Sequence, residues 1–310
     1  MAWLYGSNET FTQSTGTGYA FIGAQGGSTS AVLFDYQTAV ITAAAALPAS
    51  IGLLNGVQQQ GAIASNKSFA FIDMNNGYTP YTYSYSLNTY TARNGLSGGA
   101  VYFYGAANST NDAGYFALST GAIVKVNWSN FAISDVANSL FFDGSGGLST
   151  GFRTTSSSVL MGVGNYLAGY FGSQIGTYNY SGSPPYPVTY TLSLQKLTYT
   201  TNVLTDDAIL AWASYFNQVP YNGSCTGNQS AAFFWTDNWQ TLSYVTDTVT
   251  TGGALPTTPT GSITSTSNPA EALVSYGGAT YTFSFANQAF VATTTLTTDG
   301  YAGTSNPGWF

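Results

Sequence analysis

The stretch 81-YTYSYSLN-88 alternates large apolar and small polar side chains residue by residue. A second stretch, 188-VTYTLSLQKLTY-199, does the same until Lys196, where the alternation changes phase. Alternation with a period of two is typical of a half-buried β-strand, and a slip of one residue indicates a β-bulge. Residues 281–285 repeat the pattern. The sequence therefore predicts an all-β protein.

Short β-favouring runs continue along the chain, separated by turns rich in Gly, Asn and Pro. Three Asn-Gly pairs, at 76–77, 94–95 and 222–223, predict type I′ hairpin turns, because both central positions of that turn need positive φ. Many short strands with frequent turns favour a mainly antiparallel β-sandwich or a jelly-roll-like fold. No internal repeat is evident.

Two segments have helical character. Thr205, Asp206 and Asp207 can cap a helix N-terminus, and the apolar residues that follow predict a helix over 205–218. Consecutive alanines favour a short helix within 38–47.

Two further segments resemble linkers. The run 181-SGSPPYP-187 is a candidate boundary between a β-rich domain over 1–185 and a second β-rich segment over 186–310, although one large β domain is the alternative. Residues 250–269 are rich in Thr, Ser, Pro and Gly and carry no charge, which predicts an exposed loop or an O-glycosylated stalk.

Charge is scarce in this chain. Five Lys and Arg and twelve Asp and Glu make up 5% of 310 residues, and there is no His. Ordinary soluble domains carry about 25% charged residues. A surface wetted by Ser, Thr, Asn and Tyr instead suits a protein covered by identical neighbours or by glycans. So few cations exclude a nucleic-acid-binding face.

The termini and hydropathy bear on location. No run of 18 apolar residues occurs, so we expect no transmembrane helix. The start, MAWLYGSNET, lacks the basic and apolar regions of a signal peptide. An extracellular location, at a cell-surface appendage or a virion, is nevertheless the expectation from the ion-poor surface.

Enzymatic signatures are weak. The run 95-GLSGG-99 matches a nucleophile elbow, but a chain without His has no base for the usual triad. Cys225 is the only cysteine, which excludes a zinc cluster and favours a buried apolar role, although intermolecular pairing stays open. Glycoside hydrolysis needs only two facing carboxylates and remains a minor alternative, with Glu9 and Glu271 as the only glutamates.

A metal site is also weakly indicated. Residues 73–77 partly resemble a calcium loop, but they lack its terminal glutamate, and a hairpin turn explains them better. We therefore predict a protein that is not an enzyme and has no metal or cofactor.

Glycans and exposed aromatic side chains are the remaining candidates for recognition. Trp235 and Trp239 are interpreted as core residues, with a contact surface as the alternative. The sequons are about as numerous as composition gives by chance and are available for glycosylation. They lie at Asn8, Asn66, Asn108, Asn127, Asn179, Asn222 and Asn228.

The leading functional hypothesis is a self-assembling structural subunit of an extracellular filament or virion surface. Its strands lack the Lys residues that normally block edge-to-edge pairing, so one subunit could donate a strand from 3–13 or 290–298 to the next. The expected partners are copies of the chain itself and glycans. The alternative is a carbohydrate-binding or adhesive module. The candidate subunit contacts are Trp3, Leu4, Tyr5, Phe11, Phe290, Val291, Leu296, Trp309 and Phe310.

This Ser/Thr/Tyr-rich, charge-poor, His-free β pattern resembles the thread and pilus subunits of thermophilic archaea and the coat or appendage proteins of their viruses. The resemblance is compositional, spans the whole chain and contains no diagnostic motif, so no functional residue can be carried over. It implies β-sandwich subunits that are linked by donated strands and often glycosylated. The richness in Asn and Gln is atypical of thermophile proteins.

Overall fold

The computed structural model describes the chain in segments. These are residues 19–24, 29–48, 53–54, 57–58, 62–66, 68–73, 79–96, 106–110, 112–117, 122–138, 159–178, 188–211, 224–235, 238–258, 263–276, 279–293 and 301–303. Every regular element in these segments is a β-strand, so none of them is a helix that could cross a membrane. The all-β prediction is confirmed, whereas the predicted helices are wrong.

The strands form six four-stranded antiparallel sheets and a small hairpin. The first sheet contains β1 (Tyr19–Ala24), β2 (Ala31–Asp35), β3 (Val40–Ala43) and, from the far end of the chain, β26 (Tyr301–Gly303). The hairpin is β4 (Leu53–Leu54) with β5 (Val57–Gln58).

Each of the other five sheets is built from four strands consecutive in sequence. The second sheet contains β6 (Ala62–Ser65), β7 (Phe69–Asp73), β8 (Tyr81–Ser84) and β9 (Thr89–Ala92). The third sheet contains β10 (Ala106–Ser109), β11 (Ala113–Ala117), β12 (Ala122–Asn127) and β13 (Ile133–Asn138). The fourth contains β14 (Val159–Gly164), β15 (Ala168–Tyr178), β16 (Val188–Thr198), β17 (Val203–Ala211). The fifth sheet contains β18 (Ser224–Gly227), β19 (Ala231–Trp235), β20 (Asn238–Ser243) and β21 (Val249–Ala254). The sixth sheet contains β22 (Thr264–Ser267), β23 (Glu271–Tyr276), β24 (Ala279–Ser284) and β25 (Ala289–Ala292).

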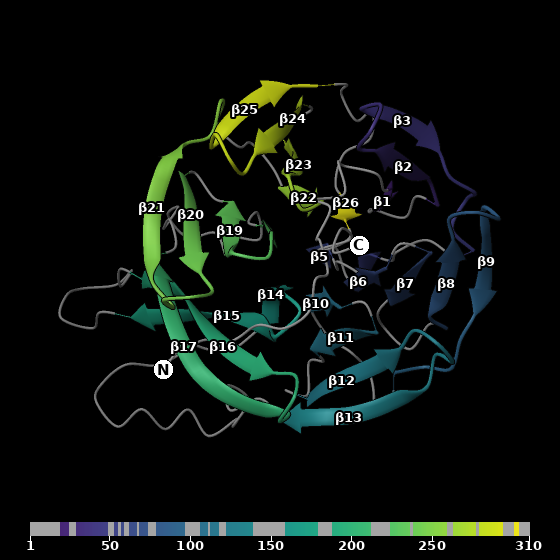
Figure 1. Cartoon of the computed structure of the whole chain (residues 1–310), viewed down its shortest axis with the longest axis horizontal. Coiled ribbons are helices and arrows are strands. Elements are labelled where there is room, and N and C mark those ends of the chain that lie inside the picture. The colour runs from purple at the N-terminus through teal and green to yellow at the C-terminus, as the bar shows by residue number, and fades with distance from the viewer. Residues whose placement is uncertain are drawn as a thin grey trace, which may run out of the picture.

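The six sheets are arranged around a centre like the blades of a propeller (Figure 1). The innermost strands contact one another in a closed cycle that runs β26, β6, β10, β14, β18, β22 and back to β26. The ring is closed by β26, which pairs with β1 and so joins the two ends of the chain in one sheet. The fold is therefore a β-propeller, and the predicted β-sandwich or jelly roll is wrong.

The outer hairpin of every blade has the same local structure. One residue per blade, just before the outermost strand, has a positive φ of 49–56°. The first turn residue is always aromatic, and the residue before it is Asp, Asn, Ser or Thr, types whose side chains commonly accept backbone N–H groups in turns. The aromatic residues are Tyr36, Tyr85, Trp128, Tyr199, Tyr244 and Phe285, and the positive-φ residues are Ala39, Asn88, Phe131, Asn202, Asp247 and Gln288.

These hairpin aromatic residues pack against the preceding blade and join the sheets. Tyr199 stacks on Tyr115, with ring centroids 4.2 Å apart, and Phe285 stacks on Phe233 at 4.7 Å. Trp128 lies in a cluster with Phe71 of the blade before it. Because each blade repeats this contact, the apolar core lies mainly between neighbouring blades. The blades therefore form a structural repeat, with turns that are unevenly spaced along the sequence.

Several local predictions are wrong. The predicted helix over 205–218 lies partly in β17, which pairs with β16; residues 212–218 lie outside the described segments. Residues 38–47 form a turn and β3 rather than a helix. The segment 250–269 contributes to β21 and contains β22, so it is not one long loop.

A bulge is present beside Lys196, but it lies in the neighbouring strand β17 and not in the strand 188–199 for which it was predicted. The pairing of β16 with β17 shifts register between Leu194 and Gln195, which face Ala208 and Asp206, so the extra residue, Asp207, belongs to β17. The pair 94–95 follows β9 and is not a hairpin turn, and 76–77 and 222–223 lie outside the described residues. The strands on either side of 179–187, β15 and β16, pair within one sheet, so a division at 185 would cut that sheet.

Candidate functional site

A tight turn recurs between the first and second strands of the blades. The side-chain Oδ1 of Asn66 accepts the backbone N–H groups of Ser68 and Phe69, both at 2.8 Å. Equivalent bonds of 2.8–3.0 Å are made in three other blades by Asn165, Asn228 and Asn268. In the third blade the hydroxyl of Thr110 takes the place of the asparagine and accepts the backbone N–H of Ala113 at 3.1 Å. These Asx turns hold the inner hairpins in one geometry.

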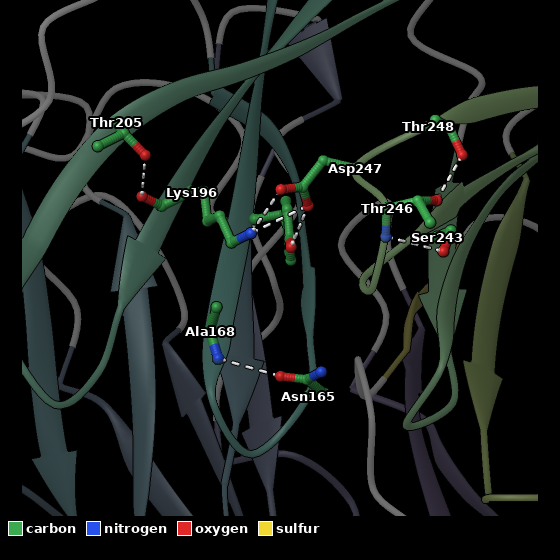
Figure 2. A network of polar contacts seen from close by, with 9 residues as sticks. Asn165, Ala168, Lys196, Thr205, Ser243, Thr246, Asp247 and Thr248 are labelled. Carbon is green, nitrogen blue, oxygen red and sulfur yellow. Dashed lines mark hydrogen bonds and ion pairs between the residues drawn. The ribbon is translucent and has the colours of Figure 1, made fainter. Parts of the chain in front are cut away.

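The described ion pair joins two blades (Figure 2). Lys196 Nζ on β16 lies 2.9 Å from both carboxylate oxygens of Asp247, which is in the outer hairpin of the next blade. The hydroxyl of Tyr170 donates to the same carboxylate at 3.1 Å, and the Tyr170 ring stacks on Tyr244 at 5.0 Å. The cluster fixes the junction of these blades and contains no unused nucleophile or base.

We expect Lys196→Met to lower the free energy of unfolding by less than about 1 kcal/mol, because both partners are partly exposed and solvent screens the pair. Urea denaturation at low and at high salt would measure the effect. The difference from the wild type should shrink at about 1 M NaCl, where the screening length is only about 3 Å. A larger loss that does not depend on salt would contradict this surface interpretation.

No group of three or more His, Cys, Asp and Glu side chains gathers in the described segments in a way that could hold a metal ion. The Cys225 thiol is buried, and burial raises its pKa to about 12, which suppresses the reactive thiolate and agrees with the apolar role predicted for it. Glu271 stands at the start of β23, and burial raises the pKa of its carboxyl. Glu9 and the run 97–99 lie outside the described residues, as does all of 73–77 except the backbone of Asp73.

Trp235 and Trp239 are core residues. Their side chains are 0% and 7% exposed, and both pack on Phe283. The core interpretation of these residues is confirmed, and the alternative of a contact surface is wrong. Among the large apolar and aromatic side chains that the structure describes as exposed, Tyr166 is the only aromatic one.

The predicted subunit contacts are only partly described. Phe290 and Val291 lie in β25; Phe290 packs on Phe283 with centroids 4.7 Å apart, whereas Val291 is 63% exposed. β25 pairs with β24 of its own sheet, so donation of residues 290–292 to another subunit is not what the structure has. The other predicted contacts lie outside the described residues: Trp3, Leu4, Tyr5, Phe11, Leu296, Trp309 and Phe310.

The predicted sequons fall into three groups. Asn66, Asn127 and Asn228 each occupy the first position of a tight turn. Asn108 lies in the innermost strand β10, opposite Tyr115. The others, Asn8, Asn179 and Asn222, lie outside the described residues.

The edge strands form a surface that sequence reasoning could not locate. β3, β9, β21 and β25 are the outermost strands of their sheets, and none of them contains a charged residue. Most of their residues are exposed, including Val40 at 48%. We call these four strands the uncharged edges.

Buried tyrosines predict a loss of stability at alkaline pH. Burial raises the pKa of Tyr115 to about 12, and it also raises the pKa of Tyr36 and Tyr244. A tyrosine whose pKa is higher in the folded state than in the unfolded state contributes its full stabilisation below the unfolded-state pKa of about 10. This stabilisation is lost as the pH rises from there toward the folded-state pKa. The free energy of unfolding should therefore fall between about pH 10 and the folded-state pKa of Tyr115, about 12.

Urea denaturation across that range would test the prediction, with Tyr115→Phe as the matched control. The variant keeps the ring that stacks on Tyr199 and removes one titrating hydroxyl, so its stability should fall less steeply with pH. A wild-type stability that stays constant across the whole range would rule out the predicted linkage.

Comparison with known proteins supports the fold alone. No family model matches the sequence, and no curated protein matches it. A crystal structure from Bacteroides fragilis named a "putative 6-phosphogluconolactonase" is similar, with a TM-score of 0.53 and 12% identity over 94% of this chain and 98% of that one. A functionally unknown protein from Desulfotomaculum acetoxidans is similar with a TM-score of 0.51 and 8% identity, covering 94% of this chain and 100% of that one. At these identities the likeness shows a shared propeller architecture.

Proposed function

We propose that this chain is a non-catalytic structural subunit that assembles with copies of itself outside the cell, through the uncharged edges of its blades. The observation that carries the proposal is the composition of β3, β9, β21 and β25. Their outward sides carry backbone N–H and C=O groups that no further strand of the described sheets pairs. Unpaired edges without charge are templates for pairing with another chain.

The distribution of cations supports the same interpretation. Monomeric β proteins commonly protect edge strands with Lys, but none of the five Lys and Arg residues lies in an outermost strand of the described sheets. Lys125 lies near the ring of Tyr115, and Arg93 lies over the ring of Phe131 at 3.8 Å, so these cations serve contacts inside the propeller. The uncharged edges consist of Val, Ile, Thr, Tyr, Phe, Gly and Ala residues.

Introduced charges at the edges would test the proposal. A variant with one lysine on each uncharged edge should shift assemblies toward monomer in sedimentation velocity, because every new pairing would bury an unpaired ammonium. A matched control places four lysines in exposed hairpins of the same four blades and should assemble like the wild type. The edge variant is Val40→Lys, Thr91→Lys, Thr251→Lys and Val291→Lys; the control is Gln37→Lys, Leu87→Lys, Val245→Lys and Asn287→Lys. Unchanged assembly of the edge variant would reject edge-mediated association.

The same proposal predicts that this chain has no lactonase activity. A phosphorylated lactone would need cationic groups to bind its phosphate. Among the cations that the structure describes, Lys196 is paired with Asp247, Arg93 donates to Thr82 at 2.9 Å and lies over the ring of Phe131, and Lys125 lies near the ring of Tyr115. Lys67 and Arg153 lie outside the described residues. We expect purified protein to leave the hydrolysis rate of 6-phosphogluconolactone at background, and turnover that depends on protein concentration would refute a non-catalytic role.

A further inference from the structure

Three sequon asparagines share one type of hydrogen bond, although Asn66 and Asn228 lie in inner hairpins and Asn127 ends β12 at an outer hairpin. In each, the asparagine Oδ1 accepts the backbone N–H of the sequon serine two residues on, at 2.8 Å. The pairs are Asn66 with Ser68, Asn127 with Ser129, and Asn228 with Ser230. The Oδ1 is therefore occupied by the turn, whereas the Nδ2 of these three side chains donates to no described group. All three serines are exposed.

Two inner hairpin turns match those of Asn66 and Asn228 but lack a sequon, and they differ in the exposure of their asparagine. Asn165, followed by Tyr166 and Leu167, is 6% exposed, and its Nδ2 donates to the backbone oxygen of Gln229 at 3.3 Å. Asn268 is 5% exposed, and its Nδ2 is buried. Asn66, Asn127 and Asn228 are all partly exposed. Among these turns, a serine at the third sequon position thus accompanies a partly exposed asparagine.

We propose that Asn66, Asn127 and Asn228 are N-glycosylated and that the folded turns present them for modification. The three turns lie at the same end of their antiparallel sheets, because connections between first and second strands and between third and fourth strands share that end. The attached sugars would cover that end of three blades. This inference is independent of the proposed assembly, since none of the three residues lies in an uncharged edge.

The modification forms one bond and breaks one. The Nδ2 of the asparagine attacks the anomeric carbon of a glycosyl phosphate or diphosphate donor, and a C–N bond forms while the phosphate leaves with the electron pair of the broken C–O bond. One amide proton passes to a base of the glycosyltransferase, a separate enzyme. The chain supplies only the acceptor nitrogen, the sequon hydroxyl and the turn that fixes them.

Asn108 is an internal reference. Its sequon, Asn108-Ser109-Thr110, lies in and after the innermost strand β10, where Asn108 pairs in register with Tyr115 of the adjacent strand and Ser109 is fully buried. An extended strand at the centre of the ring does not form the Asx turn that the other three share. We therefore expect the Asn108 peptide to be unmodified.

Glycopeptide mass spectrometry of protein isolated from its native source would test the assignment. The expected result is a sugar mass on the peptides that contain Asn66, Asn127 and Asn228, and none on the Asn108 peptide. Deamidation of asparagine to aspartate on enzymatic removal of the sugar would confirm the modified residue. Three unmodified peptides would overturn the proposal.

A designed sequon separates folded presentation from sequence recognition. Leu167→Ser places a serine two residues after Asn165, in a turn of the same geometry, where Leu167 is 52% exposed and the Asn165 amide is bonded to Gln229. In the native host we expect Asn165 of this variant to stay unmodified while the three natural sites remain glycosylated. Modification of Asn165 or Asn108 to the extent of the other sites would show that the folded geometry does not select them.

Discussion

Gly252→Ala is expected to destabilise the propeller by about 3 kcal/mol, near the upper end for overpacking of a core. A Cβ at Gly252 would overlap the indole ring of Trp239. That ring cannot easily move, since it is 7% exposed and lies between Phe233 and Phe283, with centroids 6.1 and 5.4 Å away. Urea denaturation at matched protein concentration would measure the loss.

The neighbouring glycine provides the control. A Cβ at Gly253 would lie 3.5 Å from Trp239 Nε1, which is ordinary van der Waals contact. Gly253→Ala should therefore stay within about 0.5 kcal/mol of the wild type, as most surface substitutions do. Equal losses for the two variants would mean that general strand effects, rather than the indole, govern this position.

Trp128→Ala should cost about 3–5 kcal/mol, the usual range for truncating a large buried aromatic side chain. Trp128 is 6% exposed and packs in one cluster with Ala64 and Phe71 of the preceding blade. Its Nε1 also donates to the backbone oxygen of Thr110 at 2.9 Å. The substitution removes the hairpin aromatic contact between two blades, and the urea midpoint should fall accordingly.

Trp128→Phe separates the two contributions. It keeps most of the ring contact and removes the hydrogen bond, which leaves the Thr110 oxygen to find another donor at a cost of about 1–2 kcal/mol. We expect a loss clearly smaller than that of the alanine variant. If the two variants lost the same stability, the hydrogen bond rather than ring packing would be the main contribution of Trp128.

The sequence predicted the β class because alternation is a local signal. The runs at 188–199 and 281–285 correspond to strands β16 and β24, whereas the run 81–88 is only half strand, because β8 ends at Ser84 and residues 85–88 form the hairpin turn. The bulge in β17 explains the wrong helix: an extra residue at Asp207 breaks the period of two, and a broken alternation after acidic residues resembles a capped helix.

The propeller itself was missed because its repeat is encoded in geometry more than in identity. The hairpin motif appears as Asp35-Tyr36, Ser84-Tyr85, Asn127-Trp128 and Ser284-Phe285 at uneven intervals, so no fixed period marks it. The positive-φ position accepts residues as different as Ala39 and Phe131. Closure of the ring by β26 depends on pairing between chain ends, which no local pattern reports.

The candidate site was predictable only in part. The sequons were visible as motifs, but their exposure depends on neighbouring blades, as the bond between Asn165 and Gln229 shows. The burial of Trp235 and Trp239 followed from their strand context. The pairing of Lys196 with Asp247 had no sequence signal, because it joins residues of different blades. Likewise, the lack of charge was visible in composition, but only the sheet order showed which strands are edges.

Sedimentation velocity of the purified wild-type chain over a range of concentrations tests self-association most directly. The account predicts that the sedimentation coefficient rises with concentration as propellers join through β3, β9, β21 and β25. A single species with the mass of one 32.5 kDa chain at every concentration would contradict it.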